Sequence, residues 1–308
     1  MEPPDLKKLQ EHLQKVKAVT WEELSERFII FPDVRSSADL TCSFYLVQCT
    51  SQETRDKDVV EFLVNKIVRY VLKREDILSA GRNPDLHSKN FRNARAKFIQ
   101  GRTTREAGEL LLFLLLESRG IVQVLSKMSL KTNTEMYYHG VDAVHVEVTD
   151  NVILHLGSSK MMKDFADAVK ESLSDMERHA ISVKRQDTEV NLISSYIDDS
   201  KFEPFTEFIE SVVDPYSPNR QYYGEAFSML VCSDFSFLKT PYNNKPAEQS
   251  LGQFLTDRFR KEQSGLLSKI TASLASYPHV NCKPTHFYIV PFADVERFCE
   301  LFSEVIKS

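Results

Sequence analysis

Residues 140–160, which read GVDAVHVEVTDNVILHLGSSK, contain two strand-like runs separated by the short polar interval Thr149-Asp-Asn151. Alternation of apolar residues around such an interval is typical of a β-hairpin. If the turn is centred at Asp150, then Val148 lies opposite Val152, Val144 lies opposite Leu156 and Asp142 lies opposite Ser158. This hairpin sets the register of the sheet that we expect around it.

Strand alternation puts the apolar pairs on one face of the hairpin, and this stripe ends in Asp142, Ser158 and Lys160. Directly opposed side chains have Cβ atoms roughly 5 Å apart, so both can face one metal ion. A carboxylate at the edge of an apolar face costs free energy unless a cation or hydrogen-bond donors satisfy it. We therefore predict a metal ligand at Asp142, a group that orients water or stabilises phosphate charge at Lys160, and a further ligand or base at Glu109.

Structural roles compete with this interpretation. Asp142 can form an ion pair with Lys160 across the hairpin, and Glu109 can be an acid that complements the dipole of its own helix. His145 and His155 fall on the opposite strand face from Asp142. We interpret these two histidines as surface or core residues rather than zinc ligands.

The rest of the chain predicts an α/β fold with a mixed sheet flanked by helices. The hairpin strands follow a helix and a strand in an antiparallel meander, and two later strands are expected to extend the same sheet. Gly81 and Pro84 mark the best candidate boundary between an amino-terminal α/β region and the core. The expected helices cover 4–17, 56–74, 103–118, 161–180, 247–276 and 294–307, with helical segments over 188–213. The expected strands cover 39–49, 121–130, 141–149, 151–159, 224–233 and 284–291.

Composition indicates a globular protein, because 42% of the 308 residues are hydrophobic. The longest apolar run, 110–116, is far too short to cross a bilayer, and the first residues lack the apolar stretch of a signal peptide. We expect a cytoplasmic protein without a membrane partner. The five cysteines contain no CxxC pair, so we expect small buried hydrophobic residues rather than disulfides or a zinc site.

The net charge of −5 conceals an uneven distribution of charge along the chain. Residues 77–105 contain seven Lys or Arg residues against one acid, and they lead directly into the helix of Glu109. Residues 187–227 contain nine acids against two basic residues. The basic segment beside a candidate phosphodiester site is typical of a nucleic-acid footprint, and an ordinary solvated helix face remains the alternative.

Taken together, these motifs resemble the DUF1837 family, which includes the HamA nuclease subunits of the Hachiman antiphage defence system. The resemblance covers roughly residue 30 to the end of the chain. It implies a fold of the PD-(D/E)xK nuclease group. From the order of the elements we expect residues 1–100 to form an amino-terminal α/β region packed on the core and 101–308 to form the nuclease-like domain. The segments that carry it are GELLLFLLLE at 108–117, KMSLKTN at 127–133, GVDAVH at 140–145, LGSSK at 156–160 and HFYIVPFADVE at 286–296.

The resemblance also implies a metal-dependent centre that cuts DNA, with Mg²⁺ or Mn²⁺ as the ion. Asp142 matches the family's Asp and Lys160 matches the Lys of its E-x-K segment, whereas Ser158 occupies the position of the Glu. Serine is a poor Mg²⁺ ligand beside a carboxylate and is no comparable base near neutral pH. The catalytic residues we expect are Asp142, Ser158, Lys160 and Glu109, with Asp142 and Glu109 as metal ligands.

DNA and a superfamily 2 helicase subunit, similar to HamB, are the partners that the resemblance implies. We expect Arg102, Arg105, Lys127 and Lys131 to contact nucleic acid. The acidic region 187–227 is a candidate contact for the helicase or a cover over a basic DNA path, and a solvated surface is the alternative.

Two explanations of Ser158 remain. It is either an altered catalytic residue, natural or engineered, that leaves DNA and partner binding without efficient cleavage, or Glu109 replaces the missing carboxylate. Glu147 has the wrong strand parity for that replacement. A different class also remains: a catalytically inactive adaptor whose nuclease-like core serves as a scaffold for DNA or a helicase.

Overall fold

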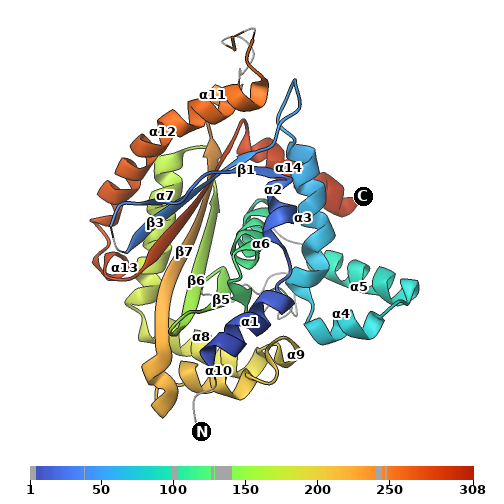
Figure 1. Ribbon diagram of the computed structural model, residues 1–308, viewed down its shortest axis with the longest axis vertical. Coiled ribbons are helices and arrows are strands. Elements are labelled where there is room, and N and C mark those ends of the chain that lie inside the picture. Colours follow the sequence, from blue (N-terminus) through green and yellow to red (C-terminus); the bar gives the residue numbers. More distant parts are fainter. Residues whose placement is uncertain are drawn as a thin grey trace.

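A computed structural model describes residues 5–37, 39–98, 103–125, 128, 141–239, 245, 246 and 248–308. Within these residues, eight strands form one curved mixed sheet with helices on both faces (Figure 1). The strand order is β1-β3-β8-β7-β6-β5-β4, and β2 pairs with β3 outside this path. The strands are β1 (Phe28–Ile30), β2 (Val34–Arg35), β3 (Leu40–Val47), β4 (Val122–Gln123), β5 (Ala143–Val148), β6 (Val152–Met161), β7 (Tyr223–Asp234) and β8 (Thr285–Phe292).

The β5–β6 hairpin has the register that the sequence predicts. The two strands are antiparallel, with Val148 opposite Val152 and Val144 opposite Leu156. Strand β4 pairs antiparallel with β5, which confirms the three-strand meander. Strand β4 covers only part of the predicted strand 121–130, of which residues 126, 127, 129 and 130 lie outside the described residues.

The centre of the sheet is parallel. Strand β7 pairs parallel with both β6 and β8, so the prediction that the two late strands extend the same sheet is confirmed. Residues 226–233 of β7 are all buried, as expected for a central strand that is covered on both faces. Strand β3 pairs parallel with β8, so the amino-terminal region contributes strands to the same sheet.

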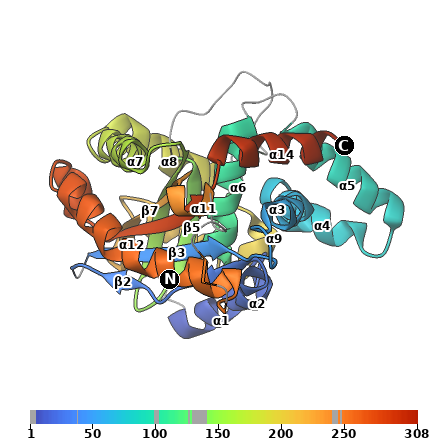
Figure 2. The same cartoon turned by 90° about the horizontal axis from the view of Figure 1, so that it is seen from above.

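Two helical layers cover the two faces of the sheet (Figures 1 and 2). Helices α3, α6 and α14 pack on one face, where all seven residues from Leu110 to Leu116 in α6 are buried. Helices α7 and α12 pack on the other face against Leu154 and Leu156. These helices are α3 (Asp56–Val71), α6 (Thr103–Ser118), α7 (Phe165–Ala180), α12 (Leu251–Leu274) and α14 (Val295–Lys307).

Among the remaining helices, α4 and α5 pack against α3 and project outward from the helical layer (Figure 1). The helical segments predicted over 188–213 are α8, α9 and α10. At the predicted boundary, Gly81 follows α4 with a φ of 52°, a left-handed conformation that glycine adopts without strain, and α5 begins at Pro84. These elements are α1 (Leu6–Val16), α2 (Trp21–Ser25), α4 (Arg74–Ala80), α5 (Pro84–Ala96), α8 (Val183–Tyr196), α9 (Asp199–Phe202), α10 (Thr206–Val213), η1 (Pro218–Tyr222), α11 (Ser236–Lys239) and α13 (Pro278–Asn281).

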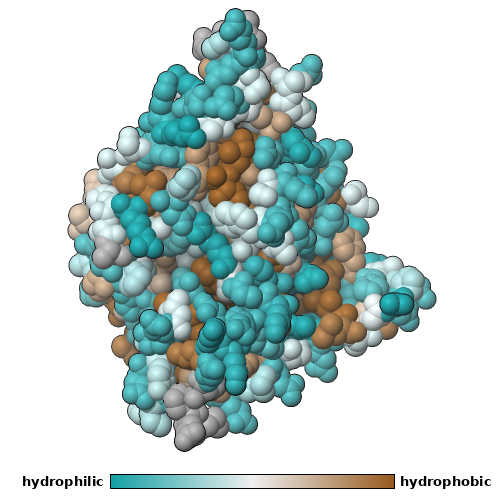
Figure 3. All heavy atoms as spheres, in the orientation of Figure 1, coloured by the Kyte–Doolittle hydropathy of each residue, from teal (hydrophilic) through white to brown (hydrophobic). Residues whose placement is uncertain are grey.

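The view in Figure 3 is mainly hydrophilic, with separate apolar patches. In the part of the chain that the structure describes, no helix has the length and apolar character needed to cross a membrane. All five cysteines are free thiols. Cys42, Cys232 and Cys299 are buried as predicted, whereas Cys49 is half-buried and Cys282 is exposed.

Candidate functional site

Helix α6 lies very close to strand β6, and two glycines permit this approach. A Cβ atom on Gly108 would lie 3.0 Å from Cγ of Met161 and 3.3 Å from Oγ of Ser159. A Cβ atom on Gly157 would lie 2.8 Å from Cβ of Ala143 and 2.9 Å from Cδ2 of Leu112. The odd-numbered residues of β6 therefore face α6. Glu109 follows Gly108 directly on this helix.

Acidic side chains gather at the amino end of α6. The phenol of Tyr70, on α3, donates a hydrogen bond of 3.4 Å to Oε2 of Glu109. Burial raises the pKa of Tyr70 well above its ordinary value, and the charges of Glu109, Asp142 and Glu106 raise it further. Since each of these carboxylates disfavours the phenolate, all three act on the same buried group. The structure thus brings the predicted residues Glu109 and Asp142 into one electrostatic cluster.

Asp142 occupies the end of the hairpin, one residue before β5. Its backbone N–H donates to the carbonyl of Gly157 at 2.7 Å, which extends the hairpin register by one residue towards Ser158. Its half-buried carboxylate accepts a hydrogen bond from the backbone N–H of Ser159 at 2.9 Å. The end of β6 therefore fixes the orientation of the Asp142 side chain.

Ser158 and Lys160 lie on the other face of the sheet, which α7 covers. The ammonium of Lys160 forms an ion pair with Asp175 and lies 4.0 Å from Glu171, and both acids belong to α7. Ser158 is 1% exposed, and its Oγ has no hydrogen-bond partner among the residues that the structure describes. The ion pair considered between Asp142 and Lys160 is replaced by the pair with Asp175.

The four predicted catalytic residues are therefore divided between the two faces of β6. Glu109 belongs to α6, and Asp142 lies at the strand end where its carboxylate accepts the N–H of Ser159, whereas Ser158 and Lys160 are directed towards α7. The neighbouring odd-numbered residue Ser159 is the one that faces Glu109's helix, because it lies against Gly108. The catalytic assignments themselves stay predictions.

The described residues do not by themselves assemble a metal site. Across residues 5–37, 39–98, 103–125, 141–239 and 248–308, no group of three or more His, Cys, Asp or Glu side chains is arranged to hold an ion. A Mg²⁺ ion needs near-octahedral oxygen ligands, so Asp142 and Glu109 alone fit one only partly.

The side chains of all four predicted DNA contacts lie outside the part of the chain that the structure describes. Arg102, Lys127 and Lys131 lie outside the described residues, and so does the side chain of Arg105 at the start of α6. Other cations of the basic segment, including Arg82, Lys89 and Arg92, are exposed on or beside α5. The basic segment therefore presents several of its charges to solvent.

A polar network at the carboxyl end of α6 has no counterpart in the predicted site. Arg119 donates two hydrogen bonds to Asp33 at 2.8 and 2.9 Å and one to Ser43 at 2.7 Å. The hydroxyl of Ser43 also bonds Asp33, and it lies 2.7 Å from Nε2 of His286. Burial and the charge of Arg119 lower the pKa of His286 to about 3. These residues come from four separate segments, so no local sequence pattern marks them.

His155 forms a second polar network, on the face of the sheet that α6 covers. Its Nδ1 lies 3.0 Å from Oγ of Ser228, and its Nε2 lies 3.0 Å from Oε2 of Glu147. His145 packs against Phe113 of α6 with ring centroids 5.9 Å apart. Both histidines are buried, which confirms the interpretation of core residues. In the predicted hairpin register, Glu147 and His155 fall on the same face of adjacent strands. This was the one signal in the sequence that could have revealed the pair.

The acidic region 187–227 forms a hollow between α8 and α10. Its volume is about 640 Å³, and its lining includes Asp187, Glu207, Glu210 and Asp214. Burial raises the pKa of Glu210, and the charges of Asp199 and Glu207 raise it further. Beside these acids, Tyr216 is 96% exposed. This part of the region is a concave acidic surface.

The mixed sheet, its two helical layers and the polar junction of α6, β5 and β6 define an α/β protein compatible with the nuclease-like folds. The model of the HamA family matches residues 21–306, so the chain belongs to the HamA family. Membership places it among the subunits of Hachiman antiphage defence. A comparison with curated proteins finds no match.

Proposed function

We propose that this chain is a nuclease-fold subunit of a Hachiman system that engages DNA with a helicase in the cytoplasm and lacks efficient metal-dependent cleavage. The observation that carries this proposal is the state of the E-x-K segment. Ser158 brings no carboxylate, and Lys160 is already neutralised by Asp175 on the face opposite Glu109. A lysine held in this way contributes little charge to a phosphate at the α6 face.

Asp142 and Glu109 are the proposed ligands of any divalent ion that binds. Such an ion would supply an activated water and neutralise developing charge. Isothermal titration with Mg²⁺ and Mn²⁺ tests the ligands directly, and Asp142→Ala should abolish whatever binding the wild-type chain shows. Unchanged binding in that variant would remove Asp142 from the metal site.

Cleavage of plasmid DNA in Mn²⁺ tests the role of Ser158. The wild-type chain should cut slowly or not at all, and Ser158→Glu should raise the rate if residue 158 occupies the missing position. Ser159→Glu is the matched control, because it places the same carboxylate one residue on, beside Gly108. Residual cleavage should disappear with Asp142→Ala.

The two glutamate variants distinguish the faces of β6. Faster cleavage with Ser158→Glu alone supports the E-x-K assignment. Faster cleavage with Ser159→Glu alone would move the centre to the α6 face and discard Ser158 and Lys160. Rapid cleavage by the wild-type chain would overturn the proposed loss of activity and would favour Glu109 as the substitute carboxylate.

The acidic hollow supports the proposed contact with a helicase, because exposed carboxylates and an exposed tyrosine offer both charge and contact area. Glu207→Lys with Glu210→Lys should weaken copurification of the helicase subunit. Glu262→Lys, an exposed acid on α12, is the matched control. Equal copurification by all three proteins would exclude the hollow as the contact.

A further inference from the structure

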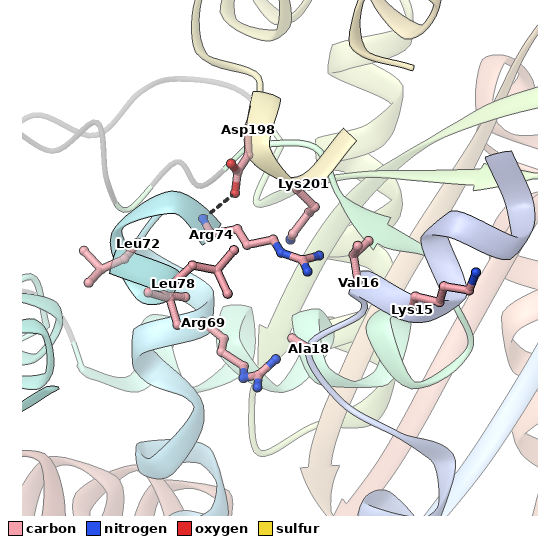
Figure 4. Close-up of a pocket in the computed structure, with 10 residues that line it drawn as sticks. Lys15, Val16, Ala18, Arg69, Leu72, Arg74, Leu78, Asp198 and Lys201 are labelled. Atoms are coloured by element: carbon pink, nitrogen blue, oxygen red, sulfur yellow. Dashed lines mark hydrogen bonds between the residues drawn. The ribbon is translucent and has the colours of Figure 1, made fainter. Parts of the chain in front are cut away.

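A second hollow, of opposite charge, lies where four segments of the chain meet (Figure 4). Its volume is about 220 Å³. The end of α1, the end of α3, helix α4 and helix α9 form its walls, and none of the predicted catalytic or DNA-contacting residues lines it. Lys15, Arg69, Arg74 and Lys201 contribute four cations to the lining, and Asp198 contributes one acid.

Asp198 is the acid in the lining of this basic pocket, and both of its carboxylate oxygens accept hydrogen bonds. One oxygen of Asp198 accepts the backbone N–H of Arg74 at 2.8 Å, and the other accepts the hydroxyl of Ser200 at 2.7 Å. Asp198 is also 7% exposed, so its position is set by packing. It ties α9 to the start of α4 and leaves the arginine side chains of the pocket to other partners.

The cations differ in how they are compensated. Lys201 is buried, lies 3.6 Å from Glu117 and donates to the carbonyl of Gln123 at 3.3 Å. In the part of the chain that the structure describes, no hydrogen bond or ion pair holds the side chains of Lys15, Arg69 or Arg74. Arg74 is half-buried all the same. A charged group that loses water without gaining a partner destabilises the protein, so this pocket favours an anion.

The shape and donor set of the pocket select the kind of anion. Arg69 and Arg74 come from adjacent helices and extend from the α3–α4 side of the hollow in Figure 4. Guanidinium groups present planar forks of N–H donors that match the oxygens of phosphate. The volume is below the range of about 300–1,000 Å³ that encloses a drug-sized molecule. A phosphate or diphosphate group fits these limits better than a large ligand.

Apolar side chains complete the lining beside the charges. Val16, Leu72 and Leu78 contribute to it, and Leu78 is 60% exposed. Figure 3 shows an apolar patch in the hydrophilic surface near α4. An exposed leucine beside two arginines offers contact to the organic part of a phosphate ester, such as a sugar or a base.

From this arrangement we infer that the basic pocket binds the phosphate group of a phosphate ester, through Arg69 and Arg74. The ester is either a free nucleotide or the backbone of a nucleic acid, and both present the same group. The nucleotide alternative goes beyond the proposed function, whereas the nucleic-acid alternative rests on the DNA binding that the proposed function includes. Neither needs cleavage of DNA or a metal, so the pocket can be tested whether or not the chain cuts DNA.

Titration of the full-length chain with inorganic pyrophosphate at low salt tests the pocket. Arg69→Gln with Arg74→Gln should weaken binding about tenfold or more, because two charge-assisted contacts are lost. The matched control is Arg258→Gln with Arg260→Gln, which removes two exposed charges from α12, away from the pocket and from the basic segment, and should leave binding unchanged. Arg69→Gln alone, at an exposed position, provides a folded variant if the double substitution unfolds the chain.

Two competition arms then identify the source of the phosphate. Displacement of pyrophosphate by a nucleoside diphosphate, but not by an oligonucleotide, assigns a free nucleotide. Displacement by an oligonucleotide that requires Arg69 and Arg74 assigns the nucleic-acid backbone. No binding of pyrophosphate, equal weakening in the control, or no displacement by either ester would overturn the inference.

Discussion

The two ends of α6 hold acidic side chains in opposite settings. At the carboxyl end, the oxygens of Glu117 accept the backbone N–H groups of Ala18 at 2.6 Å and Gln123 at 2.8 Å. At the amino end, the carboxylates of Glu106, Glu109 and Asp142 all raise the pKa of Tyr70, after the larger effect of its burial. Matched donors around one acid indicate a structural role, whereas like charges gathered around one buried group are typical of functional sites.

The same contrast extends beyond the helix itself. Arg119, just after α6, is bound by Asp33 and by hydroxyl groups, so the carboxyl end is a connected network. The amino end of α6 instead lies against Ser159 of β6, whose neighbours Ser158 and Lys160 face the opposite side of the sheet. The carboxyl end of α6 therefore stabilises the fold, and the amino end holds Glu109 of the candidate site.

The largest expected effect concerns Glu117. Glu117→Gln replaces one acceptor oxygen by a donor and removes the charge opposite Lys201, which is 8% exposed at its side chain. We expect the free energy of unfolding to fall by about 3–5 kcal/mol, as for other broken buried pairs. Urea denaturation measures this loss.

A double-mutant cycle with Lys201→Met separates the ion pair from the two backbone hydrogen bonds of Glu117. If Glu117→Gln costs less than about 1 kcal/mol, the carboxyl end is no structural anchor. The contrast between the two ends of α6 would then fail.

A smaller effect is expected from pH, through His286. Its folded pKa, lowered to about 3 by burial and by Arg119, lies below the unfolded value, so the unfolded chain binds the extra proton between these two pKa values. Stability should therefore fall as pH falls from about 6.5, by up to about 2 kcal/mol at pH 5. Denaturation at pH 7, 6 and 5 measures the slope.

His286→Gln is the control for this pH effect, because glutamine keeps a hydrogen-bonding side chain near Ser43 but does not titrate in this range. Its stability should depend less on pH than that of the wild-type chain. Identical slopes would show that His286 titrates equally in the folded and unfolded states.

The smallest effect is expected at the amino end. Tyr70→Phe removes a long hydrogen bond of 3.4 Å to Glu109 and keeps the ring that packs against Phe113. The free energy of unfolding should change by no more than about 1 kcal/mol. A loss comparable to that of Glu117→Gln would show that both ends of α6 are structural.

Several features of the fold followed from local patterns. The hairpin register is confirmed because the apolar stripe and the polar interval around Asp150 both restrict the pairing. Helix α6 matches the predicted bounds 103–118, and α3 and α14 differ from theirs by at most three residues at either end. The predicted helical segments over 188–213 are confirmed as α8, α9 and α10, with non-helical backbone at Ile197 and Phe205 between them.

Only part of the candidate site could be predicted from the sequence. The order Glu109, Asp142, Ser158, Lys160 can be read from the chain, and so can the shared face of Ser158 and Lys160. The partner of Lys160 cannot, since Asp175 belongs to a helix that only the packed sheet brings over this residue. Tyr70, whose phenol donates a hydrogen bond to Glu109, is likewise 39 residues away in the sequence.

The sequence by itself determined the family, the α/β class and the hairpin, because periodicity and turn chemistry act between near neighbours. Tertiary structure alone decided which helix covers each face of β6, how Arg119 meets Asp33 across 86 residues, and which four segments enclose the basic pocket. The physical reason is that strand alternation assigns a residue to a face, while the crossovers of a parallel sheet decide what lies against that face.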